Sequence, residues 1–323
     1  MAQPLFLQNI IAFIWDFDKT LIPEYMQAPL FDHYGIDEDR FWREVKALPD
    51  HYRKSGLDLI SADNLYLNHI LTYAKSGIFK DLNNELLKKL GGHINFYDGL
   101  PGFFDEIKAS VNRIDGYRQH DIQIEHYIVS TGLRQMIMGS KIAPFTDGVW
   151  GCEFIEVPAP ASYLQTKTKS AAAEGKPIIS QIAYALDNTT KTRAIFEINK
   201  GTNKLPDIDV NAKIADEDRR VPIQNMIYIA DGPSDIPVFS IVNQFGGRTF
   251  AVYKPGSKAE FAQVNNLQKQ GRVQSYGEAI YTAGSQTAMW LRNAVTEIAD
   301  QIVINRERAL KETIGKPPRH LNS

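Results

Sequence analysis

The strongest constraint on the fold is an unbroken apolar run from Ile10 to Trp15, followed directly by Asp16 and Asp18. Six apolar residues without alternation are typical of a strand buried on both faces, as in the middle of a parallel sheet. In open α/β sheets, ligands bind in the crevice outside the carboxyl ends of the strands. Because Asp16 and Asp18 are two residues apart, their side chains are expected to face the same mouth of the sheet.

Two interpretations of this aspartate pair remain open at this point. Asp is common where a strand ends, so the pair could form a polar turn that caps the next helix. Alternatively, the two carboxylates could hold a hard cation such as Mg²⁺ through their oxygen atoms. One of them could also attack a substrate, as carboxylates do in enzymes that form an aspartyl-phosphate.

A second apolar run, from His126 to Val129, ends at Ser130, Thr131 and Gly132. A helical pattern follows, so the backbone N–H groups there could bind an anion, and the glycine would let a backbone approach closely. Ser and Thr are also ordinary N-caps, which is the alternative interpretation.

A third apolar run, residues 226–230, leads to Asp231 and Asp235 in a turn that contains Gly232 and Pro233. Turn chemistry explains each of these residue types individually. It does not explain why three separate strands all end in oxygen-rich turns, and this repetition favours a site at the sheet mouth.

One lysine is notable for its position. Lys191 lies near the start of a predicted helix, residues 190–200, with Asn188 or Thr189 as N-cap and Gly201 as the stop. A cation near a helix start opposes the helix dipole, at a cost of about 0.3–1 kcal/mol. The position becomes favourable if the ammonium meets an anion or carboxylates across a cleft. The alternative is a solvated surface lysine.

Length and charge favour a soluble cytoplasmic enzyme. With 323 residues, the chain can bury a large core and form more than one domain. A net charge of −2 gives no electrostatic case for nucleic acid or a membrane as partner. The N-terminal residues lack the basic start of a signal peptide, and the chain has no apolar run of bilayer-spanning length. A single cysteine, Cys152, precludes an internal disulfide and is expected to be buried and inert.

In their order along the chain, these segments resemble the four-motif signature of the haloacid dehalogenase (HAD) superfamily of phosphohydrolases. The resemblance covers residues from about 10 to about 255. The sequence Asp-Phe-Asp-Lys-Thr of the first motif most resembles the branch that contains phosphoserine phosphatase and the phosphoethanolamine/phosphocholine phosphatases. Ala230, where Gly is frequent, is a mild departure that leaves the metal ligands untouched. The four motifs are Asp16-x-Asp18-x-Thr20, Ser130-Thr131-Gly132, Lys191, and Asp231-Gly232-x-x-Asp235.

The resemblance implies a Mg²⁺-dependent phosphatase that acts on a small phosphorylated metabolite. Asp16 is implied as the nucleophile, and Asp18 as the general acid and then the general base. Thr20 is implied to orient Asp18 or the metal shell. For these roles the pKa of Asp18 has to rise, which the sequence alone does not show.

The resemblance also implies the two binding sets of the site. The metal ligands would be Asp16, the backbone carbonyl of Asp18, and Asp231, with Asp235 in support. The phosphoryl oxygens would be bound by Ser130, Thr131, Gly132 and Lys191.

The fold expected is α/β, with a Rossmann-like three-layer core around a central parallel sheet and a mostly helical cap. The segment between the first two motifs is far longer than a crossover helix needs, and its apolar residues recur at helical spacing. We expect residues 1–22 and 98–323 to form the catalytic core and residues 23–97 to form the cap. In the family, an insertion at this point is a mobile lid that excludes water and contacts the leaving group.

The cap is therefore expected to select the substrate. Glu24 and Arg53 are the preferred candidates, and near the cap hinge Glu24 could pair with a cationic leaving group such as an amine. For each residue alone, a solvated surface position is the alternative. Further polar candidates are Tyr25, Arg43, His51, Tyr52 and Asn68.

Two other segments have expected structural roles. Residues 157–180 are predicted to be an exposed excursion from the sheet, with a basic phosphate-binding loop as the alternative. Residues 286–313 are predicted to form an amphipathic helix that packs on the core. A dimer contact and a membrane-surface helix are the alternatives, so a monomer or a homodimer is expected.

Three other functions of the same superfamily were weighed. Halide-releasing dehalogenases need no metal and usually lack the second aspartate, so Asp18 and Asp231 argue against that activity. A phosphotransferase or mutase shares the motifs. A catalytically inactive binding relative is disfavoured because the motif residues are intact.

Overall fold

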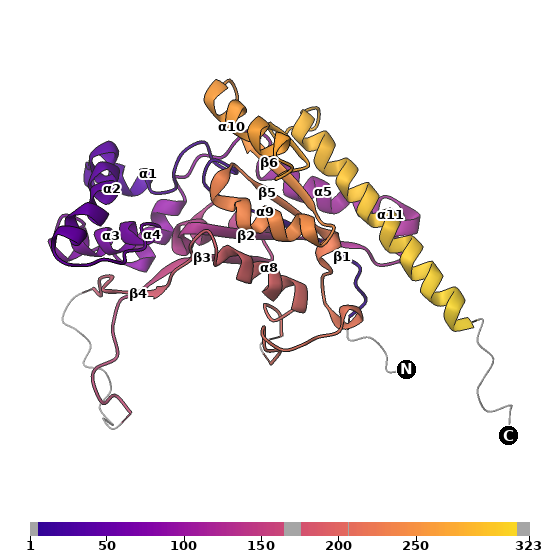
Figure 1. Cartoon of the computed structure of the whole chain (residues 1–323), viewed down its shortest axis with the longest axis horizontal. Coiled ribbons are helices and arrows are strands. Elements are labelled where there is room, and N and C mark those ends of the chain that lie inside the picture. The colour runs from indigo at the N-terminus through magenta and orange to yellow at the C-terminus, as the bar shows by residue number, and fades with distance from the viewer. Residues whose placement is uncertain (1–5, 165–175, 206, 315–323) are drawn as a thin grey trace.

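The computed structural model describes residues 6–164, 176–205 and 207–314. A seven-stranded sheet has the order β4-β3-β2-β1-β5-β6-β7, and helices cover both of its faces (Figure 1). The strands are β1 (Ile10–Trp15), β2 (Gln123–Leu133), β3 (Gly148–Ile155), β4 (Gln181–Tyr184), β5 (Met226–Ala230), β6 (Arg248–Tyr253) and β7 (Ser275–Glu278).

Six helices lie between β1 and β2, and β4 follows β3 without an intervening helix; elsewhere helices alternate with the strands. The helices are α1 (Ala28–Tyr34), α2 (Glu38–Lys54), α3 (Leu65–Lys75), α4 (Asn84–Gly91), α5 (Gly102–Asn112), α6 (Asp115–Gln119), α7 (Arg134–Gly139), α8 (Lys191–Lys200), α9 (Ile236–Gln244), α10 (Lys258–Lys269) and α11 (Gln286–Ile314). Short 3-10 turns are η1 (Ala143–Phe145), η2 (Asp216–Asp218), η3 (Ile223–Asn225) and η4 (Pro233–Asp235).

The first apolar run forms the central strand. β1 pairs in parallel with β2 on one side and with β5 on the other, and all six of its residues are buried. Every other neighbouring pair in the sheet is parallel except β3 with β4. A strand with neighbours and helices on all sides has no polar face, which explains its unalternated sequence. The predicted α/β fold with a parallel central sheet is confirmed.

The side chains of β1 alternate between two apolar clusters. Ile11, Phe13 and Trp15 join the cluster that also contains residues of α5 and α11, while Ile10 and Ile14 join the one with α8, α9 and α10. This alternation follows from the period of two along a strand. The sheet is therefore the middle layer of three.

The helices α1 to α4 all lie within residues 23–97, and they gather at one end of the molecule, opposite the end reached by α11 (Figure 1). The two connections to this helical unit run side by side, because the Tyr97 N–H donates to the Leu21 carbonyl at 3.1 Å. Buried side chains of the unit, such as Phe31 and Phe41, belong to the same apolar cluster as Trp15. The division of the chain into a core and a cap domain stays a prediction.

One predicted boundary was wrong. β2 does not end at Val129 but continues through Ser130–Gly132 to Leu133, and α7 begins only at Arg134. The pairing of β2 with β3 shifts register between Val129 and Leu133. These residues therefore lie in an irregular strand end rather than in a helix N-terminus.

The remaining predicted segments fall as follows. The long C-terminal helix spans Gln286–Ile314, and buried side chains such as Leu291 and Ile298 pack it onto the core. Of the predicted loop 157–180, residues 165–175 lie outside the described residues.

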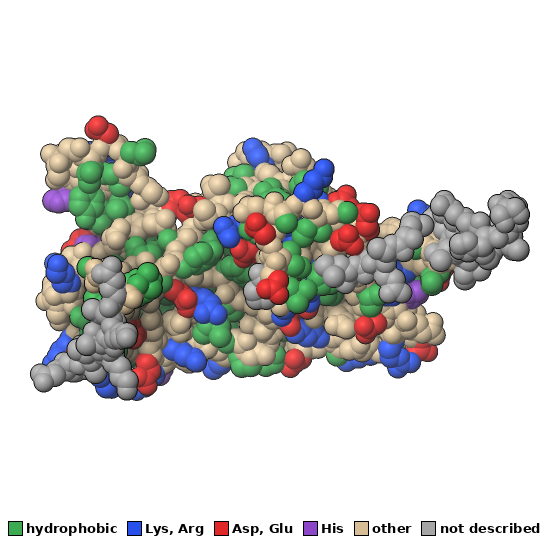
Figure 2. All heavy atoms as spheres, turned by 90° about the horizontal axis from the view of Figure 1, so that it is seen from below, with side chains coloured by type: hydrophobic (Ala, Val, Ile, Leu, Met, Phe, Trp, Pro, Cys, Tyr) green, Lys and Arg blue, Asp and Glu red, His purple; other side chains and the backbone are tan. Residues whose placement is uncertain are grey.

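Along the face seen in Figure 2, acidic and basic side chains are interspersed. Within the part of the chain that the structure describes, every helix is too short or too polar to cross a bilayer.

Candidate active site

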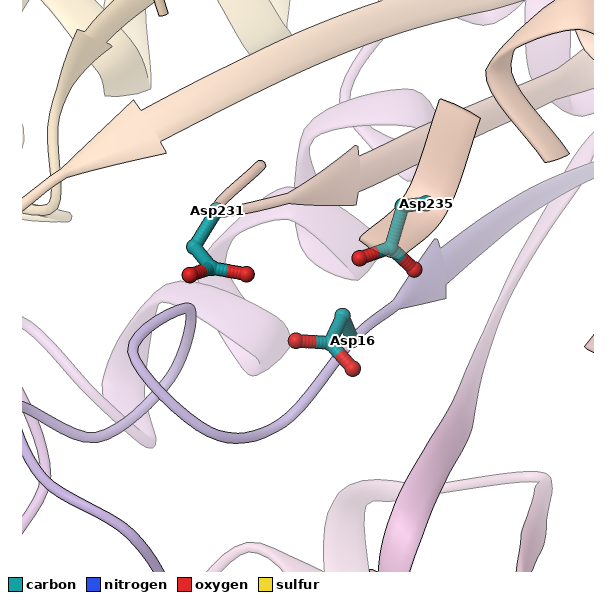
Figure 3. A group of neighbouring side chains, drawn as sticks. All are labelled: Asp16, Asp231 and Asp235. Atoms are coloured by element: carbon teal, nitrogen blue, oxygen red, sulfur yellow. The ribbon is translucent and has the colours of Figure 1, made fainter. Parts of the chain in front are cut away.

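The carboxyl ends of two neighbouring central strands, β1 and β5, bring the first and fourth motifs together. Asp16 follows β1 and Asp231 follows β5, and the parallel register places Trp15 beside Ile229. The Asp16 N–H donates to the Ile229 carbonyl at 2.9 Å, so the chain stays tied to β5 as it leaves the strand. Asp235, on the turn η4, completes a group of three aspartates whose side chains converge (Figure 3).

Lys191 binds two of these aspartates. Its Nζ lies 2.7 Å from Asp16 Oδ1 and 2.7 Å from Asp235 Oδ1. All three side chains are at least nine-tenths buried, with Lys191 2% exposed. The alternative of a solvated surface lysine is therefore wrong, and the ammonium meets carboxylates in the way that its position at a helix start suggested.

The turn before α8 sets the position of Lys191. Its backbone N–H donates to the Asp187 carbonyl at 3.1 Å. The Asp187 carboxylate accepts the N–H groups of Thr189 and Thr190, at 2.8 Å and 2.7 Å. This carboxylate satisfies helix-start donors that would otherwise be unpaired. Thr190 occupies the N-cap position, one or two residues later than predicted.

Asp235 is held by more than the lysine. The hydroxyl of Tyr228 donates to Asp235 Oδ1 at 2.5 Å, and that of Ser234 donates to Oδ2 at 2.8 Å. Sequence reasoning missed Tyr228, which lies in the middle of β5. A tyrosine in a fully buried strand was a usable signal, because its hydroxyl needs a partner there.

Burial and like charges raise the pKa values of the site's carboxyls. Burial raises the pKa of Asp16 to about 6, with Lys191 opposing the rise and Asp235 adding to it. Burial, followed by the charge of Asp16, raises the pKa of Asp18 to about 7. The same two causes raise the pKa of Asp231 well above its ordinary value. Burial lowers the pKa of Lys191, but the charges of Asp16 and Asp235 outweigh it, so the ammonium stays charged.

Three carboxylates share this site with one buried ammonium. Oxygen atoms of Asp16, Asp231 and Asp235 all lie within 4.8 Å of one another. One positive charge cannot balance three negative ones, and the charges of Asp16 and Asp235 add to the effect of burial in raising the pKa of Asp231. Carboxylate oxygens are the ligands that Mg²⁺ prefers. The donor set therefore fits a hard divalent cation.

Asp18 and Thr20 lie beside this group but make other contacts. Asp18 Oδ1 accepts the Met26 N–H at 2.7 Å, and Asp18 is only partly buried. Thr20 Oγ1 donates to Asp16 Oδ2 at 3.2 Å. The threonine therefore contacts Asp16, one of the predicted metal ligands, and not Asp18.

The second motif is ordered by a local hydrogen bond. The Gly132 N–H donates to Ser130 Oγ at 3.0 Å, and Ser130 is 1% exposed. A Cβ on Gly132 would lie 2.2 Å from Met26 Cε, so a larger residue here would require the Met26 side chain to shift. Met26 comes from the segment between the first motif and α1. Thr131 stays partly exposed beside Ser130.

Among the described residues, neither preferred cap residue forms a hydrogen bond or an ion pair with the three aspartates. Glu24 is exposed and lines a cavity of about 160 Å³ with Tyr25, Asp32 and His93. Arg53 lies in the last turn of α2, where its guanidinium pairs with Asp50 at 2.6 Å and both side chains are largely exposed. Their proposed role in substrate choice stays a prediction.

No family model matches the chain. Solved structures to which it is similar include a HAD family hydrolase from Salmonella enterica subsp. enterica serovar Typhi, with 14% identity, a TM-score of 0.48, and coverage of 85% of this chain and 67% of that one. A probable phosphoserine phosphatase from Vibrio cholerae has 14% identity, a TM-score of 0.47, and coverage of 92% and 68%. Identities this low do not assign a substrate to this chain.

One curated relative is similar over almost its whole length. A protein of Borreliella burgdorferi is 40% identical to this chain over 293 residues, which are 89% of this chain and 97% of the relative. It is described as an uncharacterized protein, so its name carries no activity. The chain belongs to the same family as this B. burgdorferi protein.

Proposed function

We propose that this protein is a Mg²⁺-dependent phosphatase of the HAD type, which hydrolyses a small phosphomonoester through an aspartyl-phosphate on Asp16. The observation that carries the proposal is the buried contact of Lys191 with Asp16 and Asp235, with Asp231 in reach of the same cation site. A carboxylate nucleophile, a fixed ammonium and a cation site at one sheet mouth are the parts that phosphoryl transfer needs.

In the first step, an oxygen of Asp16 attacks phosphorus and the bond from phosphorus to the leaving oxygen breaks. Lys191 and Thr20 each contact one Asp16 oxygen, and a carboxylate has about four acceptor sites, so lone pairs remain for the attack. The leaving alkoxide takes the proton of the Asp18 carboxyl. A pKa of about 7 makes Asp18 able to hold that proton near neutral pH.

In the second step, water attacks the phosphorus of the aspartyl-phosphate, and the bond to Asp16 breaks. Asp18, now a carboxylate, accepts the proton of this water and returns to its starting state. Phosphate leaves, and Asp16 is restored. Transfer to an acceptor other than water would use the same first step and would appear as a phosphorylated product.

The phosphoryl oxygens need donors that are in place before the reaction. Ser130 and Lys191 are both buried at the sheet mouth, so they bring a hydroxyl and an ammonium there without a cost for ordering mobile side chains. A bound Mg²⁺ would neutralise charge on the transferring group, and Asp16, the Asp18 carbonyl, Asp231 and Asp235 would hold it.

A panel of phosphate esters tests the proposal. With Mg²⁺, the protein should release phosphate from at least one small ester, and chelation should stop the release. Asp115→Asn, which changes an exposed carboxylate of α6, serves as the control and should keep the activity. Folded protein that releases no phosphate from any ester with Mg²⁺ present would refute the function. The cytoplasmic location and the monomeric or homodimeric state stay predictions.

A further inference from the structure

The peptide unit that joins Thr131 to Gly132 is held from both sides. Its carbonyl oxygen accepts the Tyr66 hydroxyl at 2.5 Å, and the Cys152 thiol lies 3.2 Å from the same oxygen. Its N–H donates to Ser130 Oγ at 3.0 Å. A carbonyl oxygen has two lone pairs, so these two donors can satisfy both. The orientation of this peptide plane is therefore coupled to the position of the Ser130 hydroxyl.

The hydrogen bond from the Gly132 N–H determines which further hydrogen bonds the Ser130 hydroxyl can form. A hydroxyl has one hydrogen to donate and two lone pairs that accept. Because Ser130 Oγ accepts from Gly132, the O–H hydrogen is still available for a second, anionic acceptor. A rotation of the peptide plane would release this acceptor contact and let the hydroxyl turn. The Thr131–Gly132 peptide thus sets the direction in which the Ser130 O–H hydrogen points.

Tyr66 reaches this peptide from one of the helices α1 to α4. It lies on α3, among the helices at the end of the molecule, and it is 7% exposed. A second contact comes from the same side, since Met26 Sδ accepts the Leu133 N–H at 3.0 Å. The strand end that carries Ser130 is therefore held by hydrogen bonds with Tyr66 and Met26, which both precede β2 in the chain.

Aromatic contacts fix Tyr66 relative to the first motif as well. Its ring lies 5.9 Å from that of Trp42, and the Trp42 ring lies 5.5 Å from that of Tyr25. Lys19 Nζ is 4.7 Å from the centre of the Tyr25 ring. Contacts of this kind each contribute modestly and together hold the geometry. The Tyr66 ring thus belongs to a series of side-chain contacts that reaches Lys19 of the first motif.

We propose that Tyr66 is a positioning residue for phosphoryl binding. Its hydroxyl fixes the Thr131–Gly132 peptide, and that peptide aims the Ser130 hydroxyl at the phosphoryl group. The catalytic part of this inference rests on the proposed phosphatase function. Since Ser130 would contact the phosphoryl group and not the leaving group, the effect of Tyr66 should be the same for every ester.

Tyr66→Phe tests the inference, and Tyr73→Phe is its matched control. Tyr73 lies on the same helix and is also 7% exposed, but its hydroxyl donates to Glu44 at 2.5 Å within the helical unit. Tyr66→Phe should lower kcat/KM about three- to tenfold, the loss expected for one hydrogen bond, by the same factor for esters with different leaving groups. Tyr73→Phe should leave kcat/KM unchanged. Equal losses in both variants, or a loss that varies with the leaving group, would overturn the inference.

A double-mutant cycle asks whether Tyr66 acts through Ser130. In a Ser130→Ala background, Tyr66→Phe should cause no further loss of kcat/KM, because the donor that it aims is gone. A full additional loss there would overturn the inference.

Amide hydrogen exchange keeps the test independent of catalysis. Tyr66→Phe should speed exchange in the peptide that covers residues 131–133, relative to both the unmutated protein and Tyr73→Phe. Unchanged exchange would overturn the positioning role. Faster exchange in a protein that releases no phosphate from any ester would instead support the positioning role of the Tyr66 hydroxyl and refute the phosphatase function.

Discussion

Two buried clusters of charged side chains lie at opposite ends of the central strands, and they differ in their balance of positive and negative charge. At the carboxyl ends, Lys191 meets Asp16 and Asp235, with Asp231 nearby. Near the amino end of β2, the guanidinium of Arg220 binds both oxygens of a single carboxylate, that of Glu125, at 2.5 Å and 2.8 Å. The second cluster pairs one positive charge with one negative charge, whereas the first has an excess of carboxylates.

The difference shows in the pKa values. For Glu125, burial acts upward, but the hydrogen bonds from Arg220 and Tyr127 and the charge of Arg220 outweigh it, so its pKa is lowered. For Asp16 and Asp231 the pKa is raised. A balanced, fully bonded pair is typical of a structural element, while an excess of buried carboxylates at a sheet mouth fits the proposed cation site. The comparison therefore predicts that the two clusters respond to mutation in opposite ways.

The largest expected effect is on activity, from Asp16→Asn. This change removes the nucleophile and should lower phosphate release at least about 10³-fold, as loss of a nucleophile does elsewhere. Because it also removes one charge from an overcrowded cluster, the free energy of unfolding without metal should change by less than about 1 kcal/mol. Initial rates and urea unfolding measure the two effects. Normal turnover in this variant would break the assignment of the site.

The balanced cluster should behave in the reverse way. Arg220→Met leaves the Glu125 carboxylate buried without its cation, and the free energy of unfolding should fall by about 3 kcal/mol. Both side chains are nearly nine-tenths buried, so solvent screens this pair little. Per folded molecule, kcat should stay within about twofold of the unmutated value, because this pair lies at the opposite end of the strands from Asp16. A twofold change in kcat corresponds to only about 0.4 kcal/mol of activation free energy. A fall in stability without a fall in kcat would show that the Arg220–Glu125 pair has a structural role only. A large loss of kcat would show that this pair also affects the catalytic site.

Metal addition should stabilise one cluster only. At a Mg²⁺ concentration a hundredfold above its Kd, binding to the folded state should raise the free energy of unfolding by about 2.7 kcal/mol. Asp231→Asn should weaken this stabilisation, and Arg220→Met should keep it. Thermal unfolding with Mg²⁺ and with chelator measures the effect. A Mg²⁺ response that survives in Asp231→Asn would place the ion elsewhere.

The sequence predicted the unbalanced cluster and missed the balanced one for the same physical reason. The position of Asp16 is set locally, because an unalternated apolar strand in a parallel sheet ends at the ligand crevice. The pairing of Arg220 with Glu125 joins residues 95 positions apart and has no local pattern. Pattern reasoning therefore finds residues placed by strand ends and misses partners placed by packing.

The same limit applies within the site. Lys191 was identified by its unfavourable position on a helix, and its two carboxylate partners explain that position. The hydroxyl of Tyr66 reaches Thr131 across 65 positions, and only the packing of the helical unit brings them together. The end of β2 was also misjudged, because the polar residues Ser130 and Thr131 continue a strand whose partner contacts are tertiary.

The smallest expected effect concerns a third buried group, His126, which lies on β2 between these two clusters and carries no charge. The Trp15 indole N–H donates to its Nδ1 at 3.2 Å, and its Nε2 lies 3.3 Å from the Phe104 carbonyl, so a neutral ring protonated on Nε2 satisfies both contacts. Burial, the largest cause, and the charge of Lys108 hold the pKa of His126 well below its ordinary value.

The sign of the resulting pH dependence follows from this lowered pKa. Below the unfolded-state pKa of about 6.5, the unfolded chain binds a proton at His126 that the folded chain does not, so stability falls as the pH decreases. Between pH 7.5 and pH 5.5 this group should cost about 1.4 kcal/mol of unfolding free energy. His126→Gln removes the titration, so its stability should depend less on pH by that amount, whereas His51→Gln, an exposed position on α2, controls for the loss of a histidine. If His126→Gln and the unmutated protein lost stability in parallel over this range, the ring would have to accept its proton inside the folded core, and the neutral hydrogen-bonded histidine described above would be wrong.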